Sequence, residues 1–531
     1  MLKISNFRIA LTDDRPLNEQ AAKRLKLPVK AVRSVQILRR AVDARRKQNI
    51  TFVHTLLVDT TIAPGQVLAK LRHDKDVTIQ NPTVEEPVVK GTQPLKERPV
   101  IVGFGPAGML AAYTLAKEGY APLVLERGGD MDRRTAAVER FWAKGEFSPE
   151  SNVQFGEGGA GTFSDGKLTT RVSDKRMSEV LELFVECGAP PDICYTHKPH
   201  IGTDILKRVV KNLRQKIIDL GGEVRFFSQV TNLEKDAFGA VKSVTIGQHE
   251  KIPASVVLLG IGHSARDTYE MLSTSVAMEA KPFAIGLRIE HPQSLLDQAQ
   301  YGSFAGHPKL GAADYALVYH DKQASRTAYS FCMCPGGIVV AAASELGGVV
   351  TNGMSHHARA SGIANSALVV NVEPRDFGPG VLAGIAFQRR YEQLAYAVAG
   401  SNYQAPGESV ASFLGLDGTS FSLSPTYRPG VVAAPLSECL PAFVTDTLRA
   451  AITDFGRKIK GFDDGGAQLT GVETRTSAPV RIRRSANFQS ENTPGLYPIG
   501  EGAGYAGGIM SAALDGMNAA YAVIAAYEPC S

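Results

Sequence analysis

A Gly-x-Gly-x-x-Gly pattern within residues 100–128 is the feature that most constrains the fold of this chain. In order, this stretch contains an apolar run at 100–102, the glycines Gly103, Gly105 and Gly108, a helix-like run of small residues at 109–118, a second apolar run at 122–125, and Glu126. A strand, a glycine turn, a helix, a second strand and an acidic residue in this order, within about 30 residues, predict a βαβ unit that binds a dinucleotide.

Each part of this unit has a physical role. Gly103 permits a tight turn from strand to helix, Gly105 lets a pyrophosphate approach the backbone, and Gly108 lets the helix pack closely on the strand. The first helical amides are unpaired and, with the helix dipole, favour an anionic ligand. Glu126, at the end of the second strand, is placed to accept hydrogen bonds from ribose hydroxyls.

The size and composition of the chain indicate a multidomain globular protein. It has 531 residues, of which 44% are hydrophobic and 21% are charged, as in soluble globular proteins of several domains. We see no apolar run near the length of about 18 residues that spans a membrane, and no apolar signal-peptide core at the N-terminus, so we expect no membrane span and a cytoplasmic location. Six cysteines without a Cys-x-x-Cys pair predict neither a disulfide framework nor a metal site.

Residues 1–83 predict a small, basic α+β module. Strand and helix patterns alternate in an order that indicates a ferredoxin-like sandwich. Residues 23–47 hold ten Lys and Arg residues and a single acid, Asp43, a charge balance that would attract RNA, an acidic partner or an anionic substrate. Because Phe52 is the only aromatic residue nearby, we favour a solvated strand face over an RNA-binding surface. Residues 84–99, with three prolines and one glycine, predict a linker.

The remaining chain predicts one dinucleotide-binding domain interrupted by an insertion. Residues 100–275 form its first part. Short β-type runs that alternate with turns predict an inserted, mostly antiparallel β domain over 276–425, and residues 426–531 return to the first domain. The predicted fold class is therefore α/β, or α+β overall. It comprises a Rossmann-like domain, an inserted β domain that faces the substrate, and the N-terminal module.

Two further glycine-rich stretches are predicted to contact the ligand. Five of the eighteen residues at 151–168 are glycine, so this loop can wrap closely around a flat ligand, and Asn152, Phe155 and Phe163 give it anchors that a plain surface loop lacks. Near the C-terminus, an apolar run ends in Gly500-Glu501-Gly502, and a helix of small residues begins near Gly508. This repeats the arrangement of a strand end and a helix N-terminus directed at a ligand.

A second glycine motif, Gly260-Ile-Gly262-His-Ser-Ala, has two interpretations. It is either a separate NAD(P) site or a closing turn of the first dinucleotide domain. No strand ending in an acidic residue follows at the expected distance, so we favour the closing turn.

The chain resembles the FAD-dependent oxidoreductases of the glutathione-reductase and p-hydroxybenzoate-hydroxylase type. More narrowly, it is similar to a bacterial group of FAD-dependent, or NAD(FAD)-utilising, dehydrogenases. The segments that carry the narrower resemblance are NVQFGEGGAGTFSDGKL, KPFAIGLRIEHP, FCMCPGG and ETRTSAPVRI. The resemblance spans nearly the whole chain and implies bound FAD, with NAD(P)H or another donor visiting transiently. It does not fix the reaction.

The resemblance also implies roles for individual residues. Arg127 would assist the pyrophosphate, Val230 would contact the adenine through its backbone, and Glu501 would stand where such proteins usually have Asp, near the ribitol. The helix start at Gly508 would face the pyrimidine edge of the flavin. The full set of expected FAD-binding residues is Gly103, Gly105, Pro106, Ala107, Gly108, Glu126, Arg127, Gly159, Gly161, Thr162, Lys167, Val230, Gly260, Gly262, Gly500, Glu501, Gly508, Ile509 and Met510.

Candidate catalytic residues flank the predicted insertion. They are Arg288, Glu290 and His291 at its entry, and Glu473 and Arg475 on the returning strand. An arginine pair at this junction would bind a carboxylate or an enolate. The competing interpretation is that these charges form salt bridges between domains.

Cys332-Met333-Cys334 and His356-His357 are two further motifs. Two cysteines beside a flavin could form a redox-active dithiol. In a regular strand, however, their side chains lie about 7 Å apart, so we favour buried structural thiols. The histidine pair is either a proton donor or a turn contact.

The leading functional hypothesis is an FAD-dependent oxidoreductase that transfers hydride between the flavin and a small-molecule substrate. One alternative is a flavin monooxygenase, although the Asp-Gly element of such enzymes is replaced here by Gly262-His263. The other alternative is a flavoprotein that binds RNA through its N-terminal module. The sequence predicts no oligomeric state.

Overall fold

The structure is a computed structural model that describes residues 1–71, 74–81, 87–416 and 422–530. It divides into two compact units. The first contains Met1–Val88, Pro190–Pro199 and Asp297–Ala313, and the second contains the rest. Parts of the predicted module and linker (72–73 and 82–86) and of the predicted insertion (417–421) lie outside the described residues.

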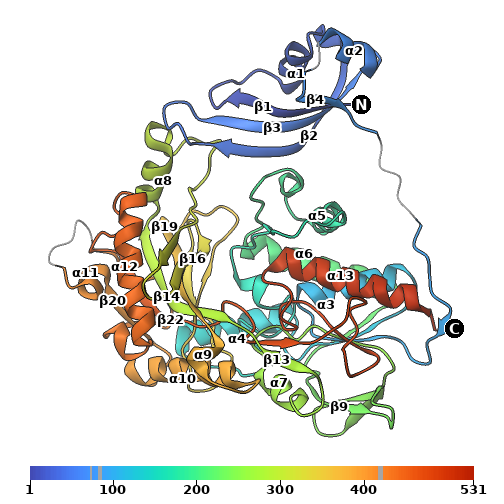
Figure 1. Ribbon diagram of the computed structural model, residues 1–531, viewed down its shortest axis with the longest axis vertical. Coiled ribbons are helices and arrows are strands. Elements are labelled where there is room, and N and C mark those ends of the chain that lie inside the picture. The colour runs from blue at the N-terminus through green and yellow to red at the C-terminus, as the bar shows by residue number, and fades with distance from the viewer. Residues whose placement is uncertain (72–73, 82–86, 417–421, 531) are drawn as a thin grey trace. The chain divides into compact units, whose positions relative to one another are not determined.

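The N-terminal module has a four-stranded antiparallel sheet with two helices (Figure 1). Its strand order is β2-β3-β1-β4, which agrees with the predicted ferredoxin-like arrangement. Alternate residues of β1 and β3, such as Leu2 and Leu56, are fully buried against the helices, as expected for a sheet with one covered face. The elements are β1 (Leu2–Ala10), α1 (Leu17–Leu25), η1 (Val29–Ala31), β2 (Val32–Asp43), β3 (Thr51–Thr60), α2 (Pro64–Lys70) and β4 (Val77–Ile79).

Two segments from much later in the chain complete this unit. One contains η3 (Pro191–Cys194) and lies beside β2, where Arg40 N donates to Tyr195 O at 2.7 Å and His197 N donates to Arg40 O at 2.9 Å. The other contains the end of α8 (Gln293–Tyr301) and η4 (Gly302–Phe304), and its Lys309 forms an ion pair with Asp14. The sequence pattern does not predict these additions, because they depend on contacts between distant residues.

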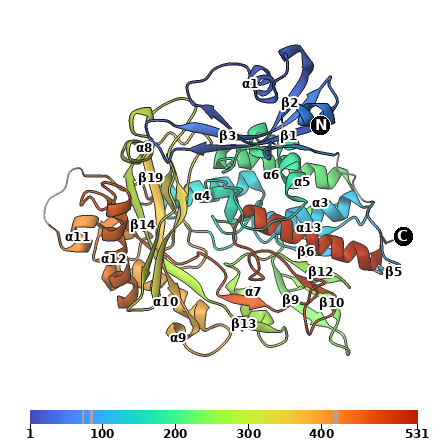
Figure 2. The same cartoon turned by 45° about the horizontal axis from the view of Figure 1, so that its top comes forward.

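The second unit contains a five-stranded parallel sheet in the order β24-β12-β6-β7-β8. The helices α3 and α13 pack side by side next to it (Figures 1 and 2). Gly516 permits this contact, since a Cβ there would lie 2.0 Å from Ala107 O. The elements are β6 (Val100–Val102), α3 (Pro106–Lys117), β7 (Leu123–Leu125), α6 (Thr203–Asp219), β8 (Glu223–Arg225), β12 (Val257–Leu259), β24 (Leu496–Pro498) and α13 (Ile509–Ala526).

Smaller elements surround this parallel sheet. β9, β10 and β11 form an antiparallel sheet, β13 pairs with β23, and β5 pairs with β25. Their bounds are β5 (Gln93–Pro94), α4 (Met131–Lys144), η2 (Ala160–Phe163), α5 (Met177–Glu186), β9 (Val230–Lys235), β10 (Val241–Ile246), β11 (Glu250–Pro253), α7 (Arg266–Leu272), β13 (Met278–Ala280), β23 (Val480–Ile482) and β25 (Tyr527–Glu528).

A seven-stranded sheet, β15-β16-β19-β14-β22-β20-β21, forms the other large part of this unit. Its neighbouring strands are antiparallel except for β20 and β21, and α12 lies along it (Figure 1). The elements are β14 (Phe283–Pro292), β15 (Val318–Asp321), β16 (Arg326–Cys334), β17 (Ile338–Ala341), β18 (Thr351–Met354), β19 (Ile363–Val372), α9 (Pro374–Phe377), α10 (Ala383–Val398), β20 (Ala405–Ser409), α11 (Val410–Leu414), β21 (Val431–Ala433), η5 (Leu436–Glu438), α12 (Ala442–Lys458) and β22 (Gln468–Glu473).

The predicted boundary between insertion and return, at residues 425 and 426, is therefore wrong. β21 and β22 are hydrogen-bonded into the seven-stranded sheet, and α12 packs on its strands. The chain rejoins the parallel sheet only after Glu473, the last residue of β22. Strand pairing between distant segments decides this boundary, and the local sequence pattern does not reveal it.

One helix among the described residues, α13, is long and apolar enough to cross a membrane by length and composition alone. Within the protein, 61% of its apolar window is buried. Its close packing on α3 is that of a core helix.

Candidate functional site

A cavity of about 340 Å³ opens in the second unit where the parallel strands end. Val102, Leu125, Gly260 and Ile499, each at or just after the carboxyl end of a parallel strand, contribute to its wall. Ligands of open α/β sheets bind at this edge. The sheet topology thus brings four separate stretches of sequence to one site.

The first glycine motif forms one end of the wall. Gly103 has φ +96°, and a Cβ there would lie 2.3 Å from Gly260 O. A Cβ on Gly108 would lie 2.0 Å from Gly103 O. At Gly105 a Cβ would meet only the Gly159 Cα, at 3.6 Å, which is ordinary contact. The protein's own packing therefore requires Gly103 and Gly108, whereas Gly105 leaves room for a ligand.

The Glu126 carboxylate lies in the cavity wall and ties the glycine turn to the following loop. It is 5% exposed and accepts hydrogen bonds from Phe104 N at 2.8 Å, and from Gly128 N and Gly156 N at 2.9 Å. Three backbone donors around one buried carboxylate fix its position in the wall.

Arg127 also borders the cavity, but its guanidinium is already engaged by protein groups. It forms ion pairs with Glu150 and Asp267, both at 2.9 Å, and lies 4.1 Å from the centroid of the Phe155 ring. Any contact between Arg127 and a pyrophosphate would compete with these two carboxylates.

A buried arginine that was not among the predicted site residues holds the loop 151–168. Arg134, with 0% exposure, donates to the carbonyl oxygens of Asn152, Val153 and Glu157 at 2.9, 2.9 and 2.6 Å. A guanidinium carries five donors in a fixed plane, so one side chain can fix several turns of the loop at once.

Most of the predicted FAD-binding residues line the cavity. They are Gly103, Gly105, Pro106, Ala107, Glu126, Arg127, Gly159, Gly161, Lys167, Val230, Gly260, Gly262, Glu501, Gly508 and Ile509. The other four, Gly108, Thr162, Gly500 and Met510, lie behind the wall. A Cβ on Gly500, for example, would lie 2.7 Å from the Ala107 Cβ, so this glycine serves packing between elements.

Two of the predicted catalytic residues form a buried ion pair. Arg288 and Glu473 are 0% and 3% exposed. Arg288 also donates to Cys332 O at 2.9 Å and to Asn352 Oδ1 at 2.9 Å. Because Glu473, Cys332 and Asn352 line the cavity, Arg288 supports the wall from behind.

The structure contradicts the predicted catalytic placement of Glu290 and His291. Neither residue lines the cavity. Glu290 is fully buried, and its carboxylate accepts hydrogen bonds from Thr426 Oγ1 at 2.5 Å and from Thr426 N at 3.2 Å. The His291 ring packs 4.6 Å from Phe462, with Nε2 2.8 Å from Phe462 O. Successive side chains of a strand point to opposite faces of the sheet, and packing around β14 buries both of these side chains completely.

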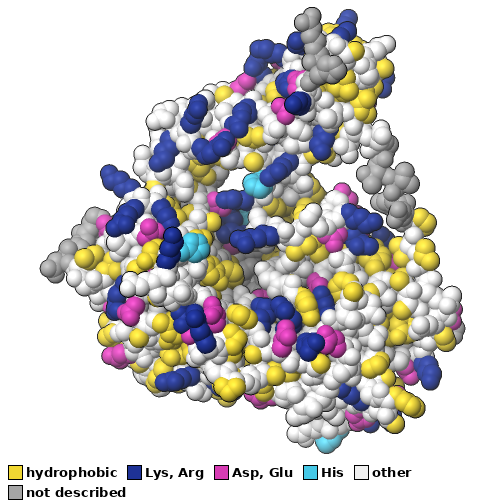
Figure 3. Space-filling view, viewed as in Figure 1, with side chains coloured by type: hydrophobic (Ala, Val, Ile, Leu, Met, Phe, Trp, Pro, Cys, Tyr) yellow, Lys and Arg dark blue, Asp and Glu magenta, His cyan; other side chains and the backbone are white. Residues whose placement is uncertain are grey.

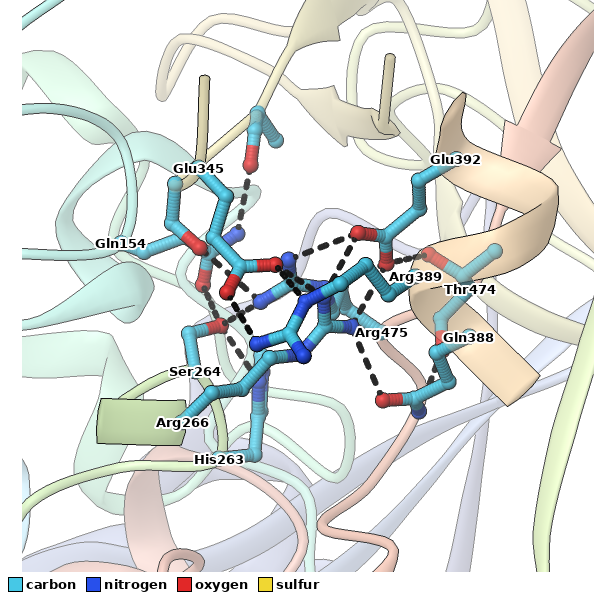
Figure 4. A network of polar contacts seen from close by, with 12 residues as sticks. Gln154, His263, Ser264, Arg266, Glu345, Gln388, Arg389, Glu392, Thr474 and Arg475 are labelled. Carbon is cyan, nitrogen blue, oxygen red and sulfur yellow. Dashed lines mark hydrogen bonds and ion pairs between the residues drawn. The ribbon is translucent and has the colours of Figure 1, made fainter. Parts of the chain in front are cut away.

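Arg475 lies in the cavity wall at the edge of a buried charge network (Figure 4). Its Nε and Nη2 donate to the two oxygens of Glu392 at 2.8 and 3.0 Å. Arg266 donates to the same carboxylate at 2.8 and 2.9 Å and forms a second ion pair with Glu345. Arg475 Nη1 continues to Ser264 Oγ at 2.8 Å. The network thus joins the second glycine motif to α10.

Two titratable groups in the wall are shifted by burial. Burial raises the pKa of Glu501 to about 7, although Lys281 opposes the shift. Burial, together with the positive charges of Arg475 and Arg266, lowers the pKa of His263 to about 3. The imidazole is therefore neutral at physiological pH, while Glu501 can gain or lose a proton there.

His357 does not line the cavity. It stacks on His200, with ring centroids 5.1 Å apart, and its Nδ1 lies 3.0 Å from Ile201 O. Of the two interpretations of this motif, the geometry favours a turn contact for His357.

Several basic side chains of the N-terminal module have partners within the first unit. Arg24 and Arg45 form ion pairs with Asp74 and Asp43 at 2.5 and 2.6 Å, and the Arg40 guanidinium lies 5.6 Å from the centroid of the Phe52 ring and 5.2 Å from that of the Tyr195 ring. Figure 3 shows Lys and Arg side chains spread among neutral and hydrophobic ones on the visible face of the module.

The cavity wall also contains residues that the sequence did not predict as site residues. They include Gln154, Phe331, Asn352 and Thr476. No sequence pattern pointed to Glu392 as the partner of the two arginines, because it stands 83 residues from Arg475 and 126 from Arg266 in the chain.

Two family models match the chain. Residues 282–476 match the model described as "FAD-dependent protein, C-terminal domain-like", and these limits agree with the extent of the seven-stranded sheet. Residues 1–59 match a domain of unknown function, DUF8436.

An uncharacterized protein of Clostridium beijerinckii is 49% identical to the chain over 534 residues, which cover 99% of each protein. The chain belongs to the same family. Within the chain, residues 282–476 are similar to the C-terminal domain of FAD-dependent proteins.

The chain is much less similar to solved structures than to this relative. CtdE in complex with FAD is 13% identical, with 80% of this chain and 83% of that chain covered and a TM-score of 0.30. Tetracycline destructase Tet(51) is 11% identical, with coverage of 80% and 79% and a TM-score of 0.32. Neither similarity bears on the reaction of this chain.

Proposed function

We propose that the protein is an FAD-dependent oxidoreductase that transfers hydride between the flavin and a small-molecule substrate. The observation that carries this proposal is the cavity at the carboxyl ends of the parallel strands, which is lined by both glycine motifs and by the start of α13. FAD supplies the two-electron chemistry when bound, and the protein supplies orientation and electrostatics.

The wall residues fit an extended dinucleotide. The space beside Gly105, where a Cβ would have no closer neighbour than 3.6 Å, suits a pyrophosphate. The start of α3 directs unpaired amides at the same place. Glu126 lies beside this turn, and we assign it to the ribose of the adenosine half. Its three backbone donors fix the carboxylate for that contact.

We assign the other end of the cavity to the flavin ring and the substrate. Gly508 is the residue before α13, which is 18 residues long. The N-terminus of this helix is the positive end of the helix dipole. That end favours negative charge on a bound ring. Glu473 lies on β22 of the seven-stranded sheet, and Asn352 lies on β18, which pairs with β17 in a separate two-stranded sheet. Arg288 donates hydrogen bonds to both side chains. Their fixed positions suit them to orient a polar substrate.

The proposal is tested by purifying the full chain, denaturing it and identifying the released cofactor by mass and chromatography. We expect one FAD per chain. A protein that refolds and binds neither FAD nor another flavin at micromolar concentration would overturn the proposal.

Anaerobic reduction then distinguishes the reaction classes. Bleaching of the flavin absorbance by NADH or NADPH without any substrate, followed by slow reoxidation in air, supports a dehydrogenase or reductase. Rapid oxygen consumption that requires an organic substrate would instead support a flavin monooxygenase.

A further inference from the structure

The end of β16 contains a bulge that changes the direction of one cysteine. Phe331 pairs with Ala367 and Cys334 pairs with Asn365, so Cys332 and Met333 together oppose Ser366. Cys332 has φ +43°, in the left-handed region that side chains rarely adopt. A bulge of this kind re-aims side chains, and the spacing of about 7 Å expected in a regular strand does not apply.

The bulge turns the Cys334 thiol back onto Cys332. The thiol donates a hydrogen bond to Cys332 O, with its sulfur 3.3 Å from that oxygen. Both residues are free thiols in this structure. Residues two apart in a chain lie within about 7 Å between Cα atoms, and a kink shortens this distance toward the range that a disulfide needs.

Two cations flank this pair. Arg288 Nη1 donates to Cys332 O at 2.9 Å, and Lys167 Nζ contacts Met333 O. The neighbouring Cys334 side chain, together with these positive charges, lowers the pKa of Cys332. Cys332 therefore ionises more readily than an ordinary thiol, and the thiolate is the reactive form of cysteine. By contrast, burial raises the pKa of Cys187 to about 11 and that of Cys439 to about 12.

The pair also stands at the proposed site. Cys332 lines the cavity together with Phe331, Asn352 and Glu473, whereas Cys334 is fully buried behind it. In thiol–disulfide exchange, an accessible thiolate attacks a reaction partner and forms a mixed intermediate. A second thiol close by then displaces that partner and closes the disulfide.

We propose that Cys332 and Cys334 form a reversible dithiol–disulfide couple that exchanges two electrons with the flavin. This inference rests on the proposed function for the presence of that flavin. In the reducing direction, the disulfide S–S bond breaks to leave the Cys332 thiolate and the Cys334 thiol. The anionic reduced flavin supplies the two electrons and the one proton for the Cys334 S–H bond, and it becomes oxidised. In the reverse direction the dithiol is oxidised and the flavin is reduced.

Anaerobic titration of the oxidised holoprotein with dithionite tests the couple. We expect the wild type to take up four electrons per flavin, two for the flavin and two for the disulfide. Cys332→Ser and Cys334→Ser should each take up two. The matched control is Cys439→Ser, which removes a buried thiol outside the cavity and should leave the uptake at four.

Mass spectrometry of the wild type gives a test that needs no variant. After oxidation, alkylation under denaturing conditions should leave the peptide containing both cysteines unlabelled, and prior reduction should restore two labels. Bound flavin with an uptake of only two electrons and full labelling of both cysteines would overturn the couple while leaving the proposed function intact. Absence of flavin from the folded protein would overturn both.

Discussion

Arg288 and Glu473 form a two-point ion pair across β14 and β22 that is almost wholly buried. Arg288 Nε lies 2.9 Å from Glu473 Oε2, and Nη2 lies 2.9 Å from Oε1. The pair couples the seven-stranded sheet to the wall of the cavity, since Glu473 faces the cavity and Arg288 contacts Cys332 and Asn352.

Arg288→Met should destabilise the protein by about 3–5 kcal/mol, because it leaves Glu473 buried without a counter-charge. Denaturant titration followed by circular dichroism measures the loss. The control is Arg481→Met, which removes an ion pair whose side chains are 40% and 47% exposed and should cost at most about 1 kcal/mol. Equal effects of the two substitutions would contradict this account. The double variant Arg288→Met with Glu473→Leu should recover part of the loss.

Glu392→Gln should destabilise the protein and disturb the cavity together. Among the described residues, Glu392 is the only carboxylate that forms an ion pair with Arg475 and one of two that do so with Arg266. The substitution therefore removes buried charge compensation from both guanidiniums. We expect a loss of at least about 3 kcal/mol and weaker flavin binding, measured by thermal unfolding and by flavin content. Glu186→Gln, which removes a surface pair with Lys216, is the control. A variant that is destabilised but keeps its full flavin content would show that Arg475 does not contribute to cofactor binding.

Glu290 makes stability depend on pH. Burial raises the pKa of Glu290 to about 7, against hydrogen bonds from Thr426 and the charge of Arg288. A carboxyl group whose pKa is raised by folding stabilises the protein fully at pH values below its unfolded pKa of about 4.5. This stabilisation is lost as the pH rises through the folded pKa of about 7. Glu290→Gln removes this dependence. The free energy of unfolding of the variant, relative to that of the wild type at the same pH, should therefore rise by about 2–3 kcal/mol from pH 5 to pH 8. Parallel stability curves for the two proteins over this range would contradict the prediction.

Gly105→Ala should separate cofactor binding from folding. The added methyl has room within the protein, at 3.6 Å from Gly159 Cα, but occupies the space assigned to the pyrophosphate. We expect nearly normal unfolding of the apoprotein and a flavin affinity lower by about tenfold or more, equivalent to at least about 1.4 kcal/mol. Flavin fluorescence on titration measures the affinity. Gly507→Ala, whose Cβ would meet nothing within 4 Å, should bind flavin more tightly than Gly105→Ala. An unchanged affinity for Gly105→Ala would contradict the assigned pyrophosphate position.

The sequence was most informative where function depends on local geometry. Gly103 and Gly108 are required by a strand-to-helix turn within six residues, so their spacing predicted both the turn and its place at the edge of the parallel sheet. The β-α-β-β-α-β order of the N-terminal module could likewise be inferred from hydrophobic alternation and helix periodicity.

Local patterns failed where strand pairing decided the outcome. Glu290 and His291 stand next to Arg288 in the chain and carry equally suggestive side chains, yet the packing of β14 in its sheet buries them away from the cavity. The boundary at residues 425 and 426 failed for the same reason, because β21 and β22 join strands far earlier in the chain.

The sequence by itself determined the dinucleotide turn, the order of the elements and most of the glycines that surround the cavity, because these follow from contacts among residues close in the chain. Only the tertiary structure decided which charges meet. The pairing of Arg475 and Arg266 on Glu392, and the bulge that brings Cys332 toward Cys334, depend on segments that fold against one another from distant positions. Such contacts depend on the packing of the whole unit, which no short stretch of sequence encodes.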